Sequence, residues 1–134
     1  MPYEEIEHTA DYAIRAEGED LAELFRSAAL GMNSLIAPHP VHGGMEVAVP
    51  IKLEGMDVEG LLVDWLGELA YLAESRSMLF HRFEFEEISE RRLKATLYGR
   101  TVDSIRKHIK AVTYHNLEVR ETDTGLEATV VFDV

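Results

Sequence analysis

The sequence predicts an α+β fold, a single domain over residues 1–134 in which two main helices pack on a largely antiparallel sheet. Two segments, residues 20–36 and 57–75, carry apolar residues at the i, i+3, i+4 spacing that gives a helix one buried face. Most of the remaining chain alternates apolar and polar residues with the period of two that is typical of half-buried strands. Because strands precede and follow each helix, we expect mainly antiparallel pairing.

The first part of the chain is predicted to form two short strands and a helix. The strands meet at a corner, residues 8–11, that contains neither Gly nor Pro. The more apolar face of the second strand consists of Tyr12, Ile14 and Ala16. Asp20 is a suitable N-cap for the helix over residues 20–36, and Glu23 lies three residues later, as in a capping box. The Ala-Pro-His-Pro sequence at residues 37–40 ends this helix.

The middle of the chain is predicted to contain a strand, the second helix and a hairpin. Residues 47–53 alternate as a strand, and Pro50 places it at a sheet edge or a bulge because proline cannot donate a ladder hydrogen bond. Asp57 caps the helix over residues 57–75, whose apolar stripe is wide enough to lie across a sheet. The next two strands, at residues 78–88 and 91–100, form the hairpin.

The side chains of this hairpin fix its inward face. The inward-facing residues are Phe83, Phe85, Leu93, Ala95 and Leu97. The alternation slips between Phe80 and Phe83, and a bulge near His81 and Arg82 would absorb the slip.

The last part of the chain is expected to form a short helix over residues 103–109 and a final hairpin. Residues 110–122 and 126–134 are the strands of that hairpin, and Gly125 supplies a permissive backbone conformation at the turn. In the last strand Leu126, Ala128, Val130, Phe132 and Val134 share one face. Asp133 therefore falls on the opposite face, next to the end of the chain.

The composition disfavours several classes of function. With 25 acidic and 13 basic residues the formal charge is −12, which would repel a phosphate backbone, so we expect little direct nucleic-acid binding. An acidic surface suits a basic protein partner or divalent cations, although it also serves solubility alone. The chain has no cysteine, which fits a reducing compartment. Because no apolar run approaches the ~20 residues of a membrane helix and no secretory signal opens the chain, we expect a cytoplasmic protein.

Two carboxylates are the leading candidates for a functional site. Asp11 lies at the mouth of the corner, on the side of its strand opposite the apolar face, and Asp133 is the penultimate residue of the chain. Clustered carboxylate oxygens bind hard cations such as Ca²⁺, Mg²⁺ or Mn²⁺. If the first, second and last strands are neighbours, Asp11, Asp133 and the Val134 terminus would form an open cation site. Taken alone, Asp11 is better explained as a turn residue that accepts backbone hydrogen bonds, and it is Asp133 that shifts the weight toward a cation site.

Other polar residues carry weaker signals. His8 lies beside Asp11 and would orient it, whereas the six histidines show no H-x-H or H-E-x-x-H spacing for a transition metal. Lys110 opens a strand and is either a solvated residue or a functional cation in an acidic chain. No serine lies in a G-x-S-x-G setting and there is no P-loop, so self-sufficient catalysis is unsupported.

Four segments together resemble the archease family over nearly the whole chain. They are HTADYAIRAEGEDLAELFRSAALGM, LLVDWLGELAYL, IKAVTYHNLEV and LEATVVFDV. The resemblance implies an α+β fold of the strand-helix-strand-strand type and a role as a protein cofactor, not an enzyme. Archeases assist the RtcB-type RNA ligase in tRNA splicing and RNA repair: they promote guanylylation of its active-site histidine and restore multiple turnover.

The resemblance also implies which residues act. The metal-binding acidic residues of the family match Asp11 and Asp133, with Val134 joining through its own oxygens, and a functionally important lysine matches Lys110. The implied metal is Ca²⁺ in the isolated protein, with Mn²⁺ or Mg²⁺ in the ligase complex. The segment at residues 100–109 departs from the longer Gly/Pro-containing stretch of many members.

Three alternative functions remain open at this stage. A chaperone-like partner of tRNA-modifying enzymes, such as tRNA methyltransferases, has also been proposed in the family. A metal-dependent hydrolase would need a positioned base and nucleophile that the sequence does not contain. A purely structural module would show no dependence on a metal.

Overall fold

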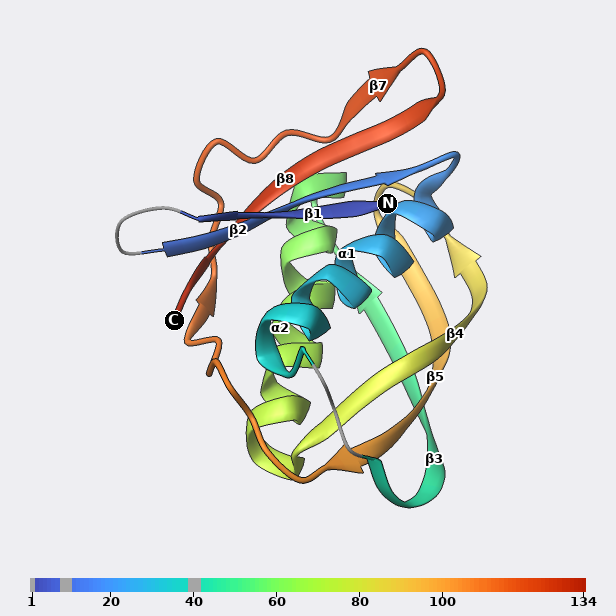
Figure 1. Ribbon diagram of the computed structural model, residues 1–134. Helices are drawn as coiled ribbons and strands as arrows, with labels where there is room; N and C mark the ends of the chain where they lie inside the picture. The colour runs from blue at the N-terminus through green and yellow to red at the C-terminus, as the bar shows by residue number, and fades with distance from the viewer. Residues whose placement is uncertain (1, 8–10, 39–41) are drawn as a thin grey trace.

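A five-stranded sheet, a three-stranded sheet and two helices make up the part of the chain described by the computed structural model, residues 2–7, 11–38 and 42–134. The five-stranded sheet contains β1 (Tyr3–Glu7), β2 (Asp11–Gly18), β8 (Gly125–Asp133) and β6 (Ala111–Val112) in that order, with β7 (Arg120–Thr122) also paired to β8. The three-stranded sheet has the order β3 (His42–Glu54), β5 (Arg92–Val102), β4 (Met78–Ile88). Every strand pair is antiparallel, so the predicted α+β class is confirmed, with the strands divided between two sheets (Figure 1).

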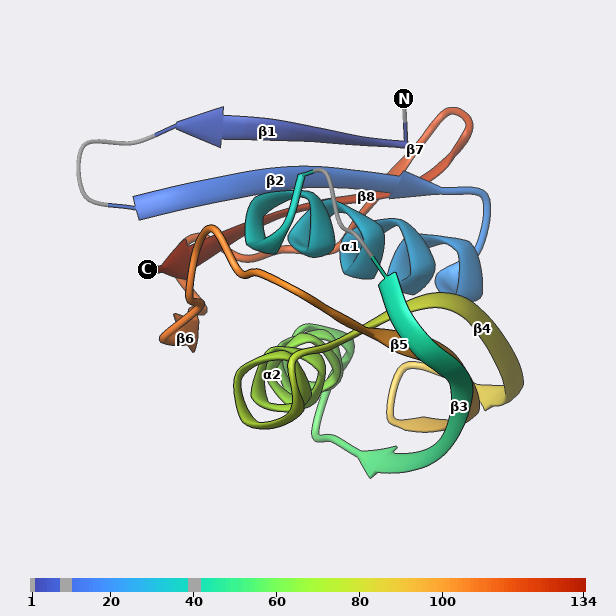
Figure 2. The same ribbon diagram turned by 60° about the horizontal axis from the view of Figure 1, so that its bottom comes forward.

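The two helices lie on the same side of the five-stranded sheet. Helix α1 (Leu21–Ile36) packs directly on β1 and β2, and α2 (Val58–Arg76) lies beyond it, next to the three-stranded sheet (Figure 2). Among the described residues, no helix is long and apolar enough to cross a membrane. The layer order leaves the opposite face of the five-stranded sheet without a helix.

Both helices begin at the predicted aspartate caps. The Asp20 side chain accepts a hydrogen bond from the Glu23 N–H at 2.9 Å, and the Asp57 side chain accepts one from the Gly60 N–H at 2.7 Å. Each bond satisfies one of the backbone donors that the first turn of a helix leaves unpaired. Helix α2 ends at Ser77, which adopts a left-handed conformation with φ of 53°. Capping therefore explains why these boundaries could be read from short local patterns.

The three-stranded sheet confirms two local predictions. Strand β3 lies at the edge of this sheet, so Pro50 occupies a strand that pairs on one side with β5. The register of β4 against β5 shifts between Phe80 and Arg82, where the slip in alternation predicted a bulge. The bulge restores Phe83 to the inner face, where it is buried.

Trp65 connects the layers of the hydrophobic core. Its ring is fully buried. The centroid of this ring lies 6.1 Å from that of Phe25 on α1, and 5.8 Å and 5.4 Å from those of Phe83 and Phe85 on β4. Its indole N–H donates to the Phe25 carbonyl oxygen at 3.0 Å. One buried cluster consequently joins α1, α2, the three-stranded sheet and the inner face of β2 and β8.

The predicted helix over residues 103–109 is wrong, because this segment has no helical hydrogen bonding. Its backbone turns instead to the end of α1, where the N–H groups of Arg106 and Lys107 donate to the Ile36 carbonyl oxygen at 2.6 and 3.3 Å. Ile105 and Ile109 have helical spacing, but both pack on the core from an irregular segment. A helix this short is marginal alone, so these tertiary contacts decide its conformation.

The final hairpin is present in part. Only residues 111–112 and 120–122 of the predicted strand 110–122 pair with β8, as β6 and β7. Gly125 occupies the turn with φ of +151°, and a Cβ atom there would lie 2.2 Å from the Gly18 carbonyl oxygen. Glycine is therefore required where the β7–β8 turn contacts the end of β2.

Trp65→Ala is expected to lower the free energy of unfolding by about 3–5 kcal/mol, since it removes a large buried ring and leaves a cavity. Tyr71→Ala on the same helix is the control, because that side chain is 63% exposed and its loss should change stability by less than about 0.5 kcal/mol. Urea unfolding followed by circular dichroism measures both. Equal effects of the two substitutions would contradict the assigned core.

Candidate functional site

The pairing of β2 with β8 brings Asp11 and Asp133 together. The two residues are direct partners at one end of a register that continues to Gly18 opposite Leu126. Residues directly opposite on antiparallel strands project to the same face, with Cβ atoms roughly 4.5–5.5 Å apart. The condition that the strands be neighbours is thus met, and two carboxylates separated by most of the chain share one end of the sheet.

Strand β6 holds the end of the chain from the other side. Ala111 pairs with Asp133, and the Lys110 backbone N–H donates to the Asp133 carbonyl oxygen at 2.8 Å. The end of β8 therefore lies between β2 and β6, and Val134 follows immediately (Figure 1). Lys110 thus has a structural role through its backbone, while its side chain is exposed.

Alternation along the strands separates the carboxylates from the core. Phe132 pairs with Tyr12 on β2 and with Val112 on β6, and it is fully buried on the face toward the helices. Asp11 and Asp133 consequently project from the opposite face, where Asp133 is exposed and Asp11 is half-buried. Like charges directly across a strand pair are destabilising, so a cation bound between them would relieve a repulsion built into the register.

The donor set at this corner suits a hard cation. Asp11 and Asp133 carry carboxylate oxygens, the ligand type that Ca²⁺, Mg²⁺ and Mn²⁺ prefer, and Val134 follows Asp133 in the chain. Within the described ranges no three His, Asp or Glu side chains gather as a complete metal site. Such a site would keep water or accept ligands from a partner. His8, expected to orient Asp11, lies outside the described residues.

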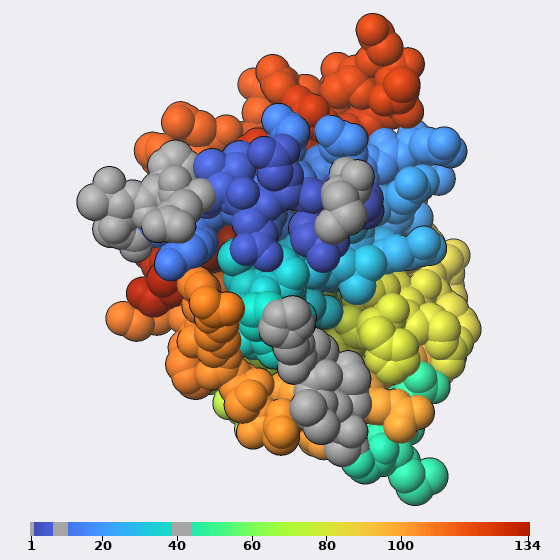
Figure 3. Space-filling view, in the orientation of Figure 1, coloured from blue at the N-terminus to red at the C-terminus, as the bar shows by residue number. Residues whose placement is uncertain are grey.

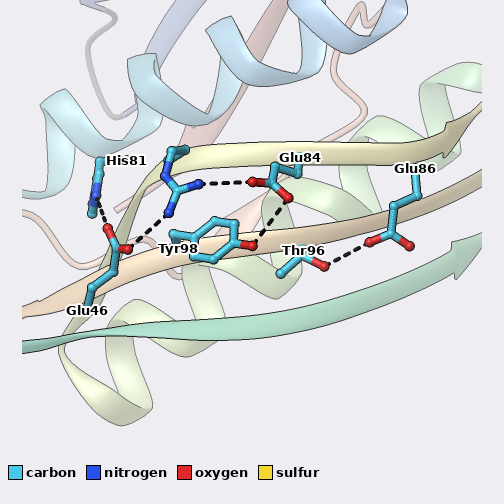
Figure 4. A network of polar contacts seen from close by, with 7 residues as sticks. Glu46, His81, Glu84, Glu86, Thr96 and Tyr98 are labelled. Atoms are coloured by element: carbon cyan, nitrogen blue, oxygen red, sulfur yellow. Dashed lines mark hydrogen bonds and ion pairs between the residues drawn. The ribbon is translucent and has the colours of Figure 1, made fainter.

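A second group of polar residues, which sequence reasoning missed, covers the exposed face of the three-stranded sheet (Figure 4). Glu46 accepts from Arg82 at 3.0 Å and lies 2.9 Å from His81, and Arg82 also donates to Glu84 at 2.9 Å. The Arg82 guanidinium carbon lies 3.7 Å from the centroid of the Tyr98 ring.

The Arg82 hydrogen bond, followed by that of His81, holds the pKa of the Glu46 carboxyl below its ordinary value. The same pair raises the pKa of Arg82. These partners come from β3, β4 and β5, so only the strand register could have revealed them. Both carboxylates of this network, Glu46 and Glu84, are paired with the Arg82 guanidinium, an arrangement typical of a sheet surface.

Comparison with known proteins places the whole chain in one family. The family model described as the Archease protein family matches residues 3–134. The archease of Methanosarcina mazei is 41% identical over 98% of this chain and 95% of its own length. The chain belongs to the archease family. The archease of Methanopyrus kandleri is 37% identical over the full length of both chains.

Solved archease structures share the fold. Protein 1598 of Methanobacterium thermoautotrophicum, solved in solution, has a TM-score of 0.73 at 29% identity and covers 99% of both chains. The crystal structure from Thermotoga maritima, described as an archease and possible chaperone, has a TM-score of 0.72 at 25% identity over 96% of this chain and 94% of its own. The resemblance drawn from the four sequence segments is therefore confirmed at the level of family and fold.

Substitution of Arg82 by Gln is expected to raise the pKa of Glu46 toward its ordinary value, and His81→Asn should raise it less, because Arg82 makes the larger contribution. Since the folded-state pKa is depressed, the contribution of Glu46 to stability exists above its unfolded pKa and is lost as pH falls through the folded value. NMR titration of the Glu46 side-chain carboxyl carbon measures the shift. A midpoint unchanged by Arg82→Gln would refute the assigned cause.

Proposed function

We propose that this chain is a metal-binding activator of an RtcB-type RNA ligase in tRNA splicing and RNA repair. It would promote guanylylation of the active-site histidine of the ligase and restore multiple turnover, as a protein cofactor and not as an enzyme. The observation that carries the proposal is the register that sets Asp11 opposite Asp133 beside the end of the chain. Membership in the archease family supports the choice of this partner.

The chemistry of guanylylation explains what such a corner would do. A histidine nitrogen of the ligase attacks the α-phosphorus of GTP, an N–P bond forms, the bond to the β-phosphate oxygen breaks, and pyrophosphate leaves. A divalent cation held by Asp11, Asp133 and Val134 would supply neutralisation of the negative charge that develops on pyrophosphate. The role of the chain would be to position these oxygens, because a misplaced cation would slow the reaction steeply.

The open donor set favours assistance to another active site. Two side-chain carboxylates leave coordination positions for water or for ligands from the ligase, as a transient complex requires. The net charge of −12 would steer the chain to a basic surface around the ligase active site. There it would compete with RNA, so its binding to the ligase would have to be transient. Ca²⁺ would occupy the corner in the isolated protein, and Mn²⁺ or Mg²⁺ in the ligase complex. We place this function in the cytoplasm.

Asp133→Ala is expected to abolish stimulation of ligase guanylylation, since it removes one of the two carboxylates and leaves the backbone bond to Lys110 in place. Asp123→Ala is the matched control, because it removes an exposed carboxylate in the β7–β8 turn. Guanylylation of a cognate ligase with labelled GTP measures the effect, and circular dichroism verifies folding. Full stimulation by the Asp133 variant would rule out the proposed role of the corner.

Binding of a cation should also appear in the thermal stability of the isolated protein. Ca²⁺ at 100 times its Kd would stabilise the folded state by about 2.7 kcal/mol and raise Tm by several degrees. Asp133→Asn should lose that increase and, without cation, be more stable by about 0.2–1 kcal/mol because the like-charge repulsion is gone. Calorimetry with Ca²⁺, Mn²⁺ and Mg²⁺ measures Tm. An equal Ca²⁺-dependent increase in the variant would place the cation elsewhere.

A chaperone-like role toward tRNA-modifying enzymes, including a tRNA methyltransferase, is the second candidate. The Thermotoga maritima structure is described as a possible chaperone, and this chain exposes Met45, Met56 and Tyr71 by 86%, 85% and 63%. Isolated apolar side chains of this kind can bind unfolded segments, although single ones are common on protein surfaces. This role predicts suppression of client aggregation that survives loss of Asp11 and Asp133, which separates it from ligase activation.

A further inference from the structure

A hollow of about 460 Å³ lies at the same end of the five-stranded sheet as the carboxylate corner. Its lining residues are Tyr12, Arg106, Lys107, His108, Lys110 and Val134. The segment between β5 and β6 that supplies most of the lining runs on the helix side of the sheet (Figure 2). In the space-filling view the end of the chain lies between the start of β2 and this segment (Figure 3). Asp11 and Asp133 project from the opposite face.

The hollow collects positive charge in an acidic protein. Three of the 13 Lys and Arg residues line it, although the chain carries a net charge of −12. Lys107 lies 4.5 Å from the centroid of the Tyr12 ring, and no ion pair reaches Arg106 or Lys110 from the described residues. Other cations, among them Arg15, Arg82 and Arg120, are paired with carboxylates. Cations without an ion pair also occur elsewhere among the described residues, at Arg26, Lys52, Arg76 and Arg91. The hollow differs in that three such cations line one cavity.

Two negative groups border these cations. Glu74 is paired with His108 at 2.7 Å, and the terminal carboxylate belongs to Val134. With both of these negative groups counted in full, the three cations Arg106, Lys107 and Lys110 still outnumber them. The balance at the hollow is positive.

The backbone of the cationic segment is held at both ends. The N–H groups of Arg106 and Lys107 donate to the Ile36 carbonyl oxygen at the end of α1, and the Lys110 N–H donates to the Asp133 carbonyl oxygen. Ile105 and Ile109 pack on the core between these anchors. The backbone that carries the cations is thus positioned before any ligand arrives, which lowers part of the entropic cost of binding.

We propose that this hollow is a polyphosphate-binding site, taking inorganic pyrophosphate or the phosphates of a nucleoside triphosphate. Its volume lies within the range of small-ligand sites, and Lys and Arg are the donors that phosphate oxygens select. The net charge of −12 opposes a long phosphate chain but leaves room for one small polyanion. Use of the site for pyrophosphate released by guanylylation rests on the proposed function, whereas binding itself does not.

The test is an NMR titration of the ¹⁵N-labelled full chain with inorganic pyrophosphate. The amide signals of residues 12, 106–110 and 134 should shift in a saturable manner. The double variant R106A/K107A should bind about tenfold more weakly, the loss expected for two exposed charge contacts. The matched control K52A/R91A removes the same charge from exposed positions on β3 and in the β4–β5 turn and should retain binding. Asp133→Ala should also retain it.

Two further titrations, with GTP and with RNA, distinguish the possible sources of the phosphate groups. GTP should compete for the same amides, whereas a short RNA with a 3′-phosphate should bind more weakly because its other phosphates meet the acidic surface. Tighter binding of that RNA would overturn the assignment to a small polyphosphate. Arg106→Gln, which alters one exposed side chain, provides a second variant should the double substitution unfold the protein.

Two results would overturn the site itself. One is the absence of saturable shifts at residues 106–110. The other is a loss of pyrophosphate affinity in K52A/R91A equal to that in R106A/K107A, because overall charge would then explain the effect. A ligase assay on the same samples distinguishes this inference from the proposed function. Stimulation without pyrophosphate binding removes the site and leaves the function. Pyrophosphate binding without stimulation removes the function and leaves the site.

Discussion

The antiparallel pairing of β2 with β8 is the constraint on which the rest of the molecule depends. It joins the corner near the start of the chain to the last residues, and the buried side chains of Ile14, Val130 and Phe132 fix its register against α1. A slip of one residue would exchange the two faces of a strand and carry a carboxylate toward the core. Burial of the inner face therefore determines where the acidic pair points.

The same sheet end separates opposite charges onto two faces. Asp11 and Asp133 project away from the helices, while the cations at residues 106–110 lie on the helix side, and the Lys110 backbone bond to Asp133 connects the two. In this way a small protein would offer both an oxygen site for a cation and a basic site for an anion.

Local features of the fold were predictable because their causes lie within a few residues. The caps Asp20 and Asp57 and the bulge before Phe83 follow from neighbouring positions in the sequence. The irregular segment at residues 103–109 was not predictable, since its backbone donors bond to Ile36, far away in the chain. For the same reason the partners of Arg82 became visible only once the register of three strands was known.

The candidate site was predictable only in part. The alternation of apolar and polar residues assigned Asp11 and Asp133 each to one face of its strand. That the two residues are neighbours depends on the order of the strands in the sheet, which alternation cannot predict. Family resemblance supplied the partner and the lysine, and neither would follow from residue chemistry. The basic hollow was missed because the expected helix over residues 103–109 hid the way in which Arg106, Lys107 and Lys110 converge.

The central claim is that the β2–β8 end binds a divalent cation, and paramagnetic broadening by Mn²⁺ tests it most directly. At substoichiometric Mn²⁺, the amide signals of residues 11–12, 110–111 and 132–134 should broaden first. The main rival is the acidic cavity at the other end of β2, lined in part by Glu17, Glu19, Glu23 and Glu127. Broadening centred there, with sharp signals at the β2–β8 end, would contradict the account.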